Sequence, residues 1–308
     1  MAIAAGNRIT LVTVTDTHYL PMVAALLKSV EANLDPAWYL DFWVVADGVH
    51  SKYRKNLEEA ADSGITSIHW VDRRDAIPRD IKLPIDNSSF PSNIYLWYFM
   101  PYFLPEGTKR AIYMDADTLN CRDLVELWNT DLGNKIAGAV PDPRIRTFEC
   151  DWGGILNFQE LHLNGNLPYL NSGVLVVDLV LWRKQGITAK ALNFVKENIR
   201  SAIYPEQYGI NLALQGQWTE INPLWNFFAT ATTNNSPYNI HFVDRKPVYH
   251  SYRNNPSFRS DFMRYLAITP WFDFQPVSEI RRYRKKIANV LPKLHVWVAR
   301  GFARFFVS

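Results

Sequence analysis

Residues 110–118 read Arg110-Ala-Ile-Tyr-Met-Asp115-Ala-Asp117-Thr118, a short apolar run that ends in two carboxylates separated by one alanine. Such a run, bounded by charges, is typical of a strand that is buried on both faces of a parallel sheet. Ligands of open α/β sheets bind beyond the carboxyl ends of strands, where Asp115 and Asp117 fall. Residues two apart in extended chain point to the same side, so both carboxylates can face one hard cation. The alternative is two solvated acids in a turn.

Strands and helices alternate before this stretch. The patterns predict strands at residues 8–15, 40–45 and 65–71, with helices beginning near Pro21 and at residues 51–63. This alternation predicts an α/β fold with a Rossmann-like parallel sheet. Neither a Gly-x-Gly-x-x-Gly nor a Walker sequence follows the first strand, so a nucleotide would have to be held differently.

The chain near and beyond the carboxylates is less regular. Residues 92–104 are strongly aromatic and predict a buried helix broken near Pro101, and residues 181–200 predict one helix. Residues 142–166 form a long stretch without a regular pattern, which is uncommon unless it is functional. A strand is expected at residues 170–178.

Composition indicates a globular protein. The 308 residues, 48% hydrophobic and 14% aromatic, suffice for one large α/β domain or two small ones. No apolar run is long enough to cross a bilayer, and the first residues lack the layout of a signal peptide, so we expect a cytoplasmic protein. Two cysteines, Cys121 and Cys150, form no disulfide framework, which agrees with a reducing compartment.

The net charge of +3 conceals an asymmetry. Residues 280–308 hold eight basic residues and no acidic one, whereas the rest of the chain has 25 basic and 30 acidic residues. Such a tail favours a negatively charged surface rather than nucleic acid. Its interspersed aromatic residues suit an interfacial helix on anionic lipid, and Pro292 excludes a spanning helix. We therefore expect a folded body at residues 1–260 and a basic, amphipathic, membrane-associating segment at residues 261–308. The alternative is a packed C-terminal helix with solvated charges. The aromatic residues are Trp297, Phe302, Phe305 and Phe306.

Five short motifs follow one another along the chain. They are Thr15-Asp16-x-x-Tyr19, Ile112 to Thr118, Asn171-Ser172-Gly173-Val174, Glu206-Gln207 with Asn211, and His241 with Lys246-Pro247. In this order they resemble the retaining glycosyltransferases of family 8, a group that contains bacterial lipopolysaccharide galactosyl- and glucosyltransferases and glycogenin. The resemblance covers about residues 8–250. It implies a GT-A fold with a mixed, mainly parallel sheet, a UDP-sugar donor and a divalent cation, Mn²⁺ or Mg²⁺.

The resemblance also implies a metal site. Asp115, Asp117 and His241 correspond to the ligands, and two carboxylates with one imidazole suit Mn²⁺. The cation would stabilise charge on the departing UDP. Lys246 would be a point charge for phosphate. His250 is a rival to His241 as the third ligand.

The other motif residues correspond to donor contacts. Asp16 and Tyr19 are expected at the nucleobase and ribose, although Asp16 could instead be a helix cap. Asn171 is expected at the sugar, and Gly173 would let the backbone approach the ligand closely. The remaining residues expected to bind substrate are Asp115, Asp142, Ser172, Asn211 and Lys246.

Glu206 and Gln207 are the expected catalytic residues. The resemblance implies that Gln207 lies near the anomeric carbon, on the face opposite the leaving group. An uncharged amide is a poor nucleophile. We therefore favour attack from the leaving-group face, with a UDP phosphate oxygen accepting the acceptor's proton and Gln207 stabilising oxocarbenium-like charge.

Two positions depart from the family pattern. Trp97 stands where the family commonly has an arginine that reaches the donor, and Asp244 occupies a glycine region. Arg144 or Arg146 could replace the missing cation. The departure at Trp97 leaves the donor sugar open.

The resemblance implies a metal-dependent, retaining hexosyltransferase that moves galactose or glucose from a UDP-sugar to a glycan or lipid-linked acceptor. We expect it to act in the synthesis of lipopolysaccharide or another cell-surface glycan, at the inner face of the plasma membrane. One alternative is a haloacid-dehalogenase-like phosphatase with Asp115 as nucleophile, although three predicted strands precede the motif and no Gly-Asp-x-x-x-Asp follows it. Another is a non-catalytic sugar-binding protein.

Overall fold

A mixed sheet forms the centre of the protein. The structure, a computed structural model, describes residues 7–86, 88–232, 234–280, 283–284 and 286–294. Within these residues, seven strands form a sheet in the order β3-β2-β1-β4-β7-β6-β8. Strand β7 is antiparallel to both of its neighbours, and every other neighbouring pair is parallel. The strands are β1 (Arg8–Asp16), β2 (Tyr39–Asp47), β3 (Thr66–Asp72), β4 (Arg110–Met114), β6 (Ala137–Pro141), β7 (Leu170–Asp178) and β8 (Trp218–Glu220).

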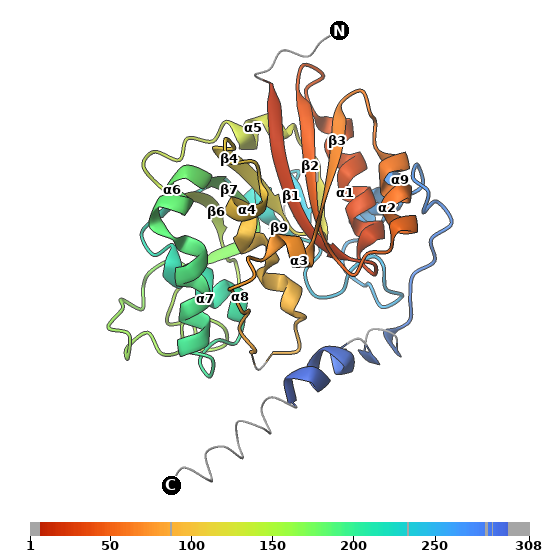
Figure 1. Ribbon diagram of the computed structural model, residues 1–308. Coiled ribbons are helices and arrows are strands. Elements are labelled where there is room, and N and C mark those ends of the chain that lie inside the picture. Colours follow the sequence, from red (N-terminus) through yellow and green to blue (C-terminus); the bar gives the residue numbers. More distant parts are fainter. Residues whose placement is uncertain (1–6, 87, 233, 281–282, 285, 295–308) are drawn as a thin grey trace.

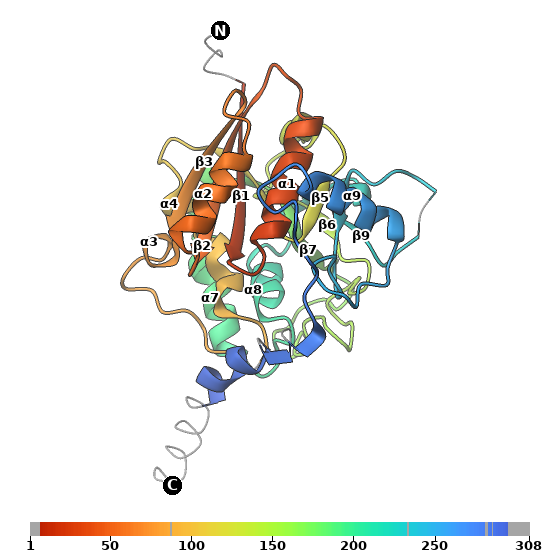
Figure 2. The same ribbon diagram turned by 90° about the vertical axis from the view of Figure 1, so that its right-hand side faces the viewer.

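Helices cover both faces of this sheet (Figure 1). Two large apolar clusters fill the spaces between the helices and the sheet, one on each face. Helix α1 packs centrally on one face, and α9 lies against it, as Figure 2 also shows. The helices of this face are α1 (Leu20–Asn33), α2 (Ser51–Ala60), α5 (Leu124–Trp128) and α9 (Pro256–Leu266). Those of the other face are η1 (Ser92–Phe99), α4 (Met100–Phe103), α6 (Leu179–Gln185), α7 (Ile187–Glu197) and α8 (Pro205–Ala213), while the short α3 (Arg73–Ala76) and η2 (Pro223–Asn226) lie in connections.

Strand β4 is buried on both faces, as its unbroken apolar run predicts. Ile112 and Met114 belong to the cluster beneath α1, and Ala111 and Tyr113 belong to the opposite cluster. The strand therefore carries Asp115 from the centre of the core to the edge of the sheet where ligands bind.

Two helix predictions need correction. The aromatic segment is not one broken α-helix, because η1 is a 3₁₀ helix that continues into the single turn of α4. The helix expected at residues 181–200 is two helices, α6 and α7. The chain changes direction at Gly186, whose φ of 62° lies in the left-handed region that glycine adopts without a steric penalty.

A small second sheet completes the fold beside the carboxyl end of β4. It has the order β5-β10-β9, and His241 of β10 pairs with Thr118 of β5. This pairing brings His241 next to Asp117, which immediately precedes β5. The strands are β5 (Thr118–Asn120), β9 (Phe227–Phe228) and β10 (Asn239–His241).

The expected boundary between residues 260 and 261 is wrong, because it falls inside α9. Phe262 and Leu266 of that helix are fully buried in the cluster beneath α1. Further on, Val277 bridges to Tyr249. The folded body therefore extends at least to Val277. In the part of the chain that the structure describes, no helix is long and apolar enough to cross a membrane. The aromatic residues expected at an interface, Trp297, Phe302, Phe305 and Phe306, lie outside the described residues.

Candidate active site

A cavity of about 400 Å³ opens at the carboxyl ends of β1 and β4. This volume is within the usual range for ligand pockets. Because β7 runs antiparallel to β4, it presents its first residues at the edge where β4 presents its last ones. The wall of the cavity therefore combines Asp115 and Asp117 with Asn171 and Ser172.

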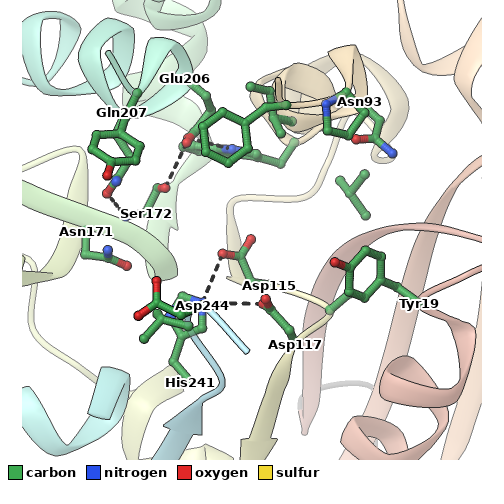
Figure 3. Close-up of a pocket in the computed structure, with 18 of the residues that line it drawn as sticks. Tyr19, Asn93, Asp115, Asp117, Asn171, Ser172, Glu206, Gln207, His241 and Asp244 are labelled. Carbon is green, nitrogen blue, oxygen red and sulfur yellow. Dashed lines mark hydrogen bonds and ion pairs between the residues drawn. The ribbon is translucent and has the colours of Figure 1, made fainter. Parts of the chain in front are cut away.

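Asp115, Asp117 and His241 form a compact cluster in this cavity (Figure 3). His241 Nε2 lies 3.6 Å from Asp115 Oδ2 and 3.4 Å from Asp117 Oδ1. One ligand atom from each of the three side chains lies within 4.8 Å of the others. Two carboxylates and one imidazole at this spacing fit a divalent cation such as Mn²⁺. The structure thus brings His241 to the carboxylates, whereas the exposed His250 is not among the residues that line the cavity.

A chain of amide side chains orients His241. Asn226 Oδ1 lies 2.8 Å from His241 Nδ1, and Asn226 Nδ2 donates to Asn171 Oδ1 at 2.7 Å. Asn171 Nδ2 in turn donates to Asp142 Oδ2 at 2.7 Å, and the other oxygen of Asp142 accepts the backbone N–H groups of Arg144 and Ile145. Each donor in the chain fixes the orientation of the next group, so the carbonyl oxygen of Asn226 is presented to Nδ1 of His241 and Nε2 faces the carboxylates. A proton held on Nδ1 by this contact would free Nε2 to serve as a ligand when a cation is bound.

Gly173 lies against the histidine ring. A Cβ atom at this position would lie 2.5 Å from Cε1 and 2.6 Å from Nδ1 of His241. The glycine therefore makes room for the ring rather than lining the cavity itself. Its carbonyl accepts the N–H of Asp115 at 2.9 Å, which ties the end of β4 to β7.

The two carboxyl groups have different charge environments. Burial and the neighbouring Asp117 raise the pKa of Asp115, and Tyr113 donates to its Oδ1 at 2.6 Å. Burial alone would raise the pKa of Asp117 as well, but Lys246 and His241 outweigh this effect and lower it. Lys246 forms an ion pair with Asp117 and also lines the cavity. The two carboxyl groups thus form an anionic site, and the ammonium group of Lys246 lies beside it.

Glu206 and Gln207, at the start of α8, form the opposite wall (Figure 3). Gln207 Oε1 accepts the N–H of Ser172 at 3.3 Å. Glu206 accepts hydrogen bonds from Trp97 Nε1 at 2.9 Å and from Ser172 Oγ at 3.1 Å. Burial, reinforced by the charge of Asp115, raises the pKa of Glu206 to about 8. Trp97 therefore does not take the place of the arginine that the family commonly has there. Its ring stacks on Tyr113, and its Nε1 donates to Glu206.

Asp16 and Tyr19 line the cavity on the side of β1. Asp16 Oδ1 accepts the backbone N–H groups of His18 and Tyr19 at 2.9 and 3.2 Å. These bonds close a turn that precedes α1, whose N-cap is Tyr19, so Asp16 is not the helix cap that the sequence left open. The carboxylate borders the cavity at the same time. In Figure 3, Tyr19 lies on the opposite side of the carboxylate cluster from Glu206 and Gln207.

Two expected contacts lie elsewhere. Asn211 is fully buried, and its amide bonds to both backbone groups of Leu170 and to the carbonyl of Gln207. It joins α8 to β7 and is not a cavity residue, which corrects the expectation of a substrate contact. Arg146 is exposed away from the cavity, whereas Arg144 lines it and pairs with Asp244 at 2.8 Å.

Asp244 has a φ of 61°, in the left-handed region that favours glycine. This backbone conformation suits the glycine that the family resemblance led us to expect in this region, and aspartate is among the few other residues that tolerate it.

Sequence reasoning missed several residues of the site. Asn226 stands between Trp225 and Phe227, where no motif singles it out, although a lone amide in an aromatic run is an available signal. Phe90 and Trp152, which line the mouth of the cavity, each contact Tyr204. Their positions depend on how two irregular segments fold, which periodicity does not reveal.

The sequence matches the family model of glycosyl transferase family 8 over residues 10–250. General stress protein A of Bacillus subtilis (strain 168) is 24% identical over 281 residues, which cover 85% of this chain and 94% of that protein. Lipopolysaccharide 1,2-glucosyltransferase of Escherichia coli (strain K12) is 22% identical over 300 residues, which cover 91% of this chain and 84% of that protein. The chain spans only 53% to 62% of the length of several other relatives.

The fold is also that of a solved glycosyltransferase. The galactosyltransferase LgtC, whose structure was determined in complex with donor and acceptor sugar analogues, superposes with a TM-score of 0.70 at 21% identity. The match covers 87% of this chain and all of LgtC (100%). The expected GT-A fold is thereby confirmed.

Proposed function

The chain belongs to glycosyl transferase family 8, and from this membership we propose that it is a retaining hexosyltransferase that moves galactose or glucose from a UDP-sugar to a glycan or lipid-linked acceptor. One observation carries the proposal most directly. Tyr19, the Asp115–Asp117–His241 cluster and the Glu206–Gln207 pair line one cavity in that spatial order. A nucleotide sugar has three parts in the same order, a base, a diphosphate and a sugar.

The cluster would hold a divalent cation, Mn²⁺ or Mg²⁺, through Asp115, Asp117 and His241. When bound, the cation supplies Lewis-acid stabilisation of the diphosphate leaving group. Lys246 lies on the same side of the cavity as Asp117 and adds a second positive charge for phosphate oxygens.

The sugar end of the cavity supports attack from the leaving-group face. Gln207 is uncharged, and the raised pKa of Glu206 keeps that carboxyl group largely protonated near neutral pH. Neither side chain is then an effective nucleophile. The acceptor hydroxyl instead forms the new bond on the face from which UDP departs, and its proton passes to a phosphate oxygen of UDP. Gln207 Oε1 would stabilise the positive charge that develops on the sugar ring.

The acceptor is proposed to be a glycan or glycolipid of the cell surface, such as lipopolysaccharide. The name of the E. coli relative, a lipopolysaccharide 1,2-glucosyltransferase, supports this choice. The basic segment after Glu279 supports it further, because eight basic residues without an acidic one favour an anionic membrane surface. We therefore propose peripheral association with the inner face of the plasma membrane.

A panel of UDP-sugars, screened for UDP release with and without Mn²⁺, tests the proposal. We expect Mn²⁺-dependent release from UDP-galactose or UDP-glucose, and none after chelation with EDTA. Asp115→Asn should abolish both the release and the thermal shift caused by Mn²⁺. Phosphate release from a generic phosphomonoester would indicate a phosphatase instead. Ligand-induced thermal shifts without any turnover would indicate a sugar-binding protein.

A further inference from the structure

One lysine of the C-terminal segment is fully engaged with the body of the protein. Lys293 lies in the tail helix, residues 286–294, and only 12% of its side chain is exposed. Its Nζ donates to Asp86 Oδ1 at 2.6 Å and to the carbonyls of Ser88 and Phe90 at 3.1 and 2.7 Å. One turn earlier, Asn289 Nδ2 donates to the carbonyl of Ser89 at 3.3 Å. The tail helix is therefore bound to residues 88–91, which we call the mouth segment.

The acceptor of this lysine is a buried carboxylate. Asp86 is fully buried, and it also accepts the N–H and the hydroxyl of Ser88 at 2.9 and 2.6 Å and the hydroxyl of Tyr95 at 2.8 Å. In the described residues, Lys293 is the cation paired with it. Removing the countercharge of a buried carboxylate is strongly unfavourable, so this pair holds the tail helix in one position.

The same carboxylate is linked to the cavity by two routes. Phe90 and Pro91 of the mouth segment line the cavity directly. Tyr95, which donates to Asp86, lies in η1, and two residues later Trp97 of that helix donates to Glu206. The position of the tail helix is thus connected with both the mouth and the sugar end of the cavity.

The other side of the tail helix is apolar and exposed. Ile287, Leu291 and Leu294 are 58%, 59% and 50% exposed, and their spacing places them on one face. At 100° per residue, this face is roughly opposite to Asn289 and Lys293. Figures 1 and 2 both show the helix at the end of the molecule where the chain enters η1. The basic residues of the segment complement an anionic bilayer, which is the occupant we assign to this face.

We propose that Lys293 is a positioning residue that couples membrane binding to the cavity: binding of the tail helix to an anionic lipid surface orders the mouth segment through Asp86 and so promotes turnover at that surface. The inference rests on the proposed transferase function only for its effect on turnover. Its structural half concerns the mouth segment and can be measured without any sugar donor.

Hydrogen exchange of the full-length protein tests the structural half. The probes are the backbone amides of Ser88 and Phe90, which bond to Asp86 Oδ1 and Ser88 Oγ. We expect vesicles of phosphatidylcholine with phosphatidylglycerol, but not of phosphatidylcholine alone, to slow their exchange at least about fivefold, the lower end of typical coupling between sites. UDP release, measured in parallel, should rise by a similar factor.

Lys293→Met is expected to retain sedimentation with anionic vesicles. It should lose both the slower exchange of the Ser88 and Phe90 amides and the increase in UDP release. Lys286→Met is the matched control, because it removes the same charge from an exposed position of the same helix and should respond like the wild type. The double variant Asp86→Asn/Lys293→Met leaves no unpaired buried charge, so it separates loss of coupling from loss of folding. It should be stable and still unresponsive.

Three results would overturn the inference. These are unchanged exchange of Ser88 and Phe90 in wild-type protein that sediments with vesicles, a normal response of Lys293→Met, and loss of vesicle binding by Lys293→Met but not by Lys286→Met. The last result would make Lys293 a lipid contact. Absence of UDP release with every donor would contradict the proposed function instead, and the exchange measurements would still decide the coupling.

Discussion

Asn226 determines which nitrogen of His241 faces the two carboxylates. Its Oδ1 lies 2.8 Å from Nδ1, and its Nδ2 is committed to Asn171. Asn226→Leu should therefore weaken Mn²⁺ binding by about 10- to 100-fold, the usual effect of losing a residue that orients a metal ligand. Calorimetric titration of Mn²⁺ in the presence of UDP measures the change. Asn226→Asp retains an acceptor for the Nδ1 proton and should bind more tightly than the leucine variant; equal affinities would contradict the orienting role.

Gln207 offers a test of the reaction path. If it stabilises charge and forms no bond to the sugar, Gln207→Ala should retain some turnover and give a product with the same α-linkage. The rate loss should be about 100- to 1000-fold, comparable with removal of one stabilising group. NMR of the product reports the anomer. Complete inactivity of a folded variant that still binds UDP would favour a covalent path through this residue.

Glu206 should make stability depend on pH. Its pKa is raised to about 8 in the folded protein, so between its ordinary pKa and 8 the folded state keeps a proton that the unfolded state has lost. The retained proton contributes to the free energy of unfolding. This contribution is complete at low pH and disappears as the pH rises from about 5 to 8. Urea unfolding in EDTA should show that Glu206→Gln, which cannot titrate, loses less stability than the wild type across this window. Parallel curves would mean that Glu206 is charged throughout.

At the residue scale, sequence alone located the groups whose chemistry is distinctive. Asp115, Asp117 and His241 stand in recognisable motifs, and the structure brings them together. Asn226 could not be found in this way, because its role depends on the neighbours that β9 and β10 give it. The corrected role of Asn211 has the same cause, since an amide at this spacing can face either the cavity or the backbone of β7.

At the scale of elements, the contact between β7 and β10 decides the geometry of the Asp115–Asp117–His241 cluster. Gly173→Ala would place a Cβ 2.5 Å from the ring of His241, so either the ring or the strand must move. We expect loss of the Mn²⁺-induced thermal shift, with unfolding destabilised by about 1–3 kcal/mol, as is usual when a core is overpacked. Differential scanning fluorimetry with and without Mn²⁺ measures both effects. Gly107→Ala is the control, because a Cβ there meets no atom within 4 Å.

Hydrophobic periodicity predicted most of the elements but not how they are arranged. The run at residues 170–178 indicates a strand, yet nothing in its composition says that β7 is antiparallel to β4. The direction of a strand depends on the connection that precedes it. Here residues 142–169, which connect β6 to β7, contain no regular helix or strand. The break at Gly186 was missed for a related reason: α6 and α7 are each apolar on their buried side, so the pattern continues through a change of direction.

At the scale of the whole molecule, truncation after Glu279 should have two effects. Loss of the basic segment should abolish sedimentation with anionic vesicles. Loss of Lys293 should also leave Asp86 buried without its countercharge, and we expect the free energy of unfolding to fall by about 3 kcal/mol. Chemical denaturation measures this change. Adding Asp86→Asn to the truncated chain should restore most of the stability; if it does not, the loss arises from other contacts of the tail.

Charge counting identified the tail as a basic, amphipathic segment but could not foresee its attachment. Lys293 is one of eight basic residues, and nothing in the sequence marks it as the one whose partner lies more than two hundred residues earlier. The misplaced boundary at residue 260 reflects the same limitation, because charged and polar residues alternate with apolar ones along α9 and only Phe262 and Leu266 are buried in the core.

The late position of β10 has a consequence for how the chain matures on the ribosome. Strands β1 to β4, with Asp115 and Asp117, emerge and can associate well before His241 is synthesised, and His241 takes its place only by pairing with β5. Folding proceeds with synthesis from the N-terminus, so a nascent chain carries an incomplete ligand set until its last third is made. We therefore expect the proposed cation to bind tightly only after β10 has emerged, and translation products arrested before β10 should remain metal-free.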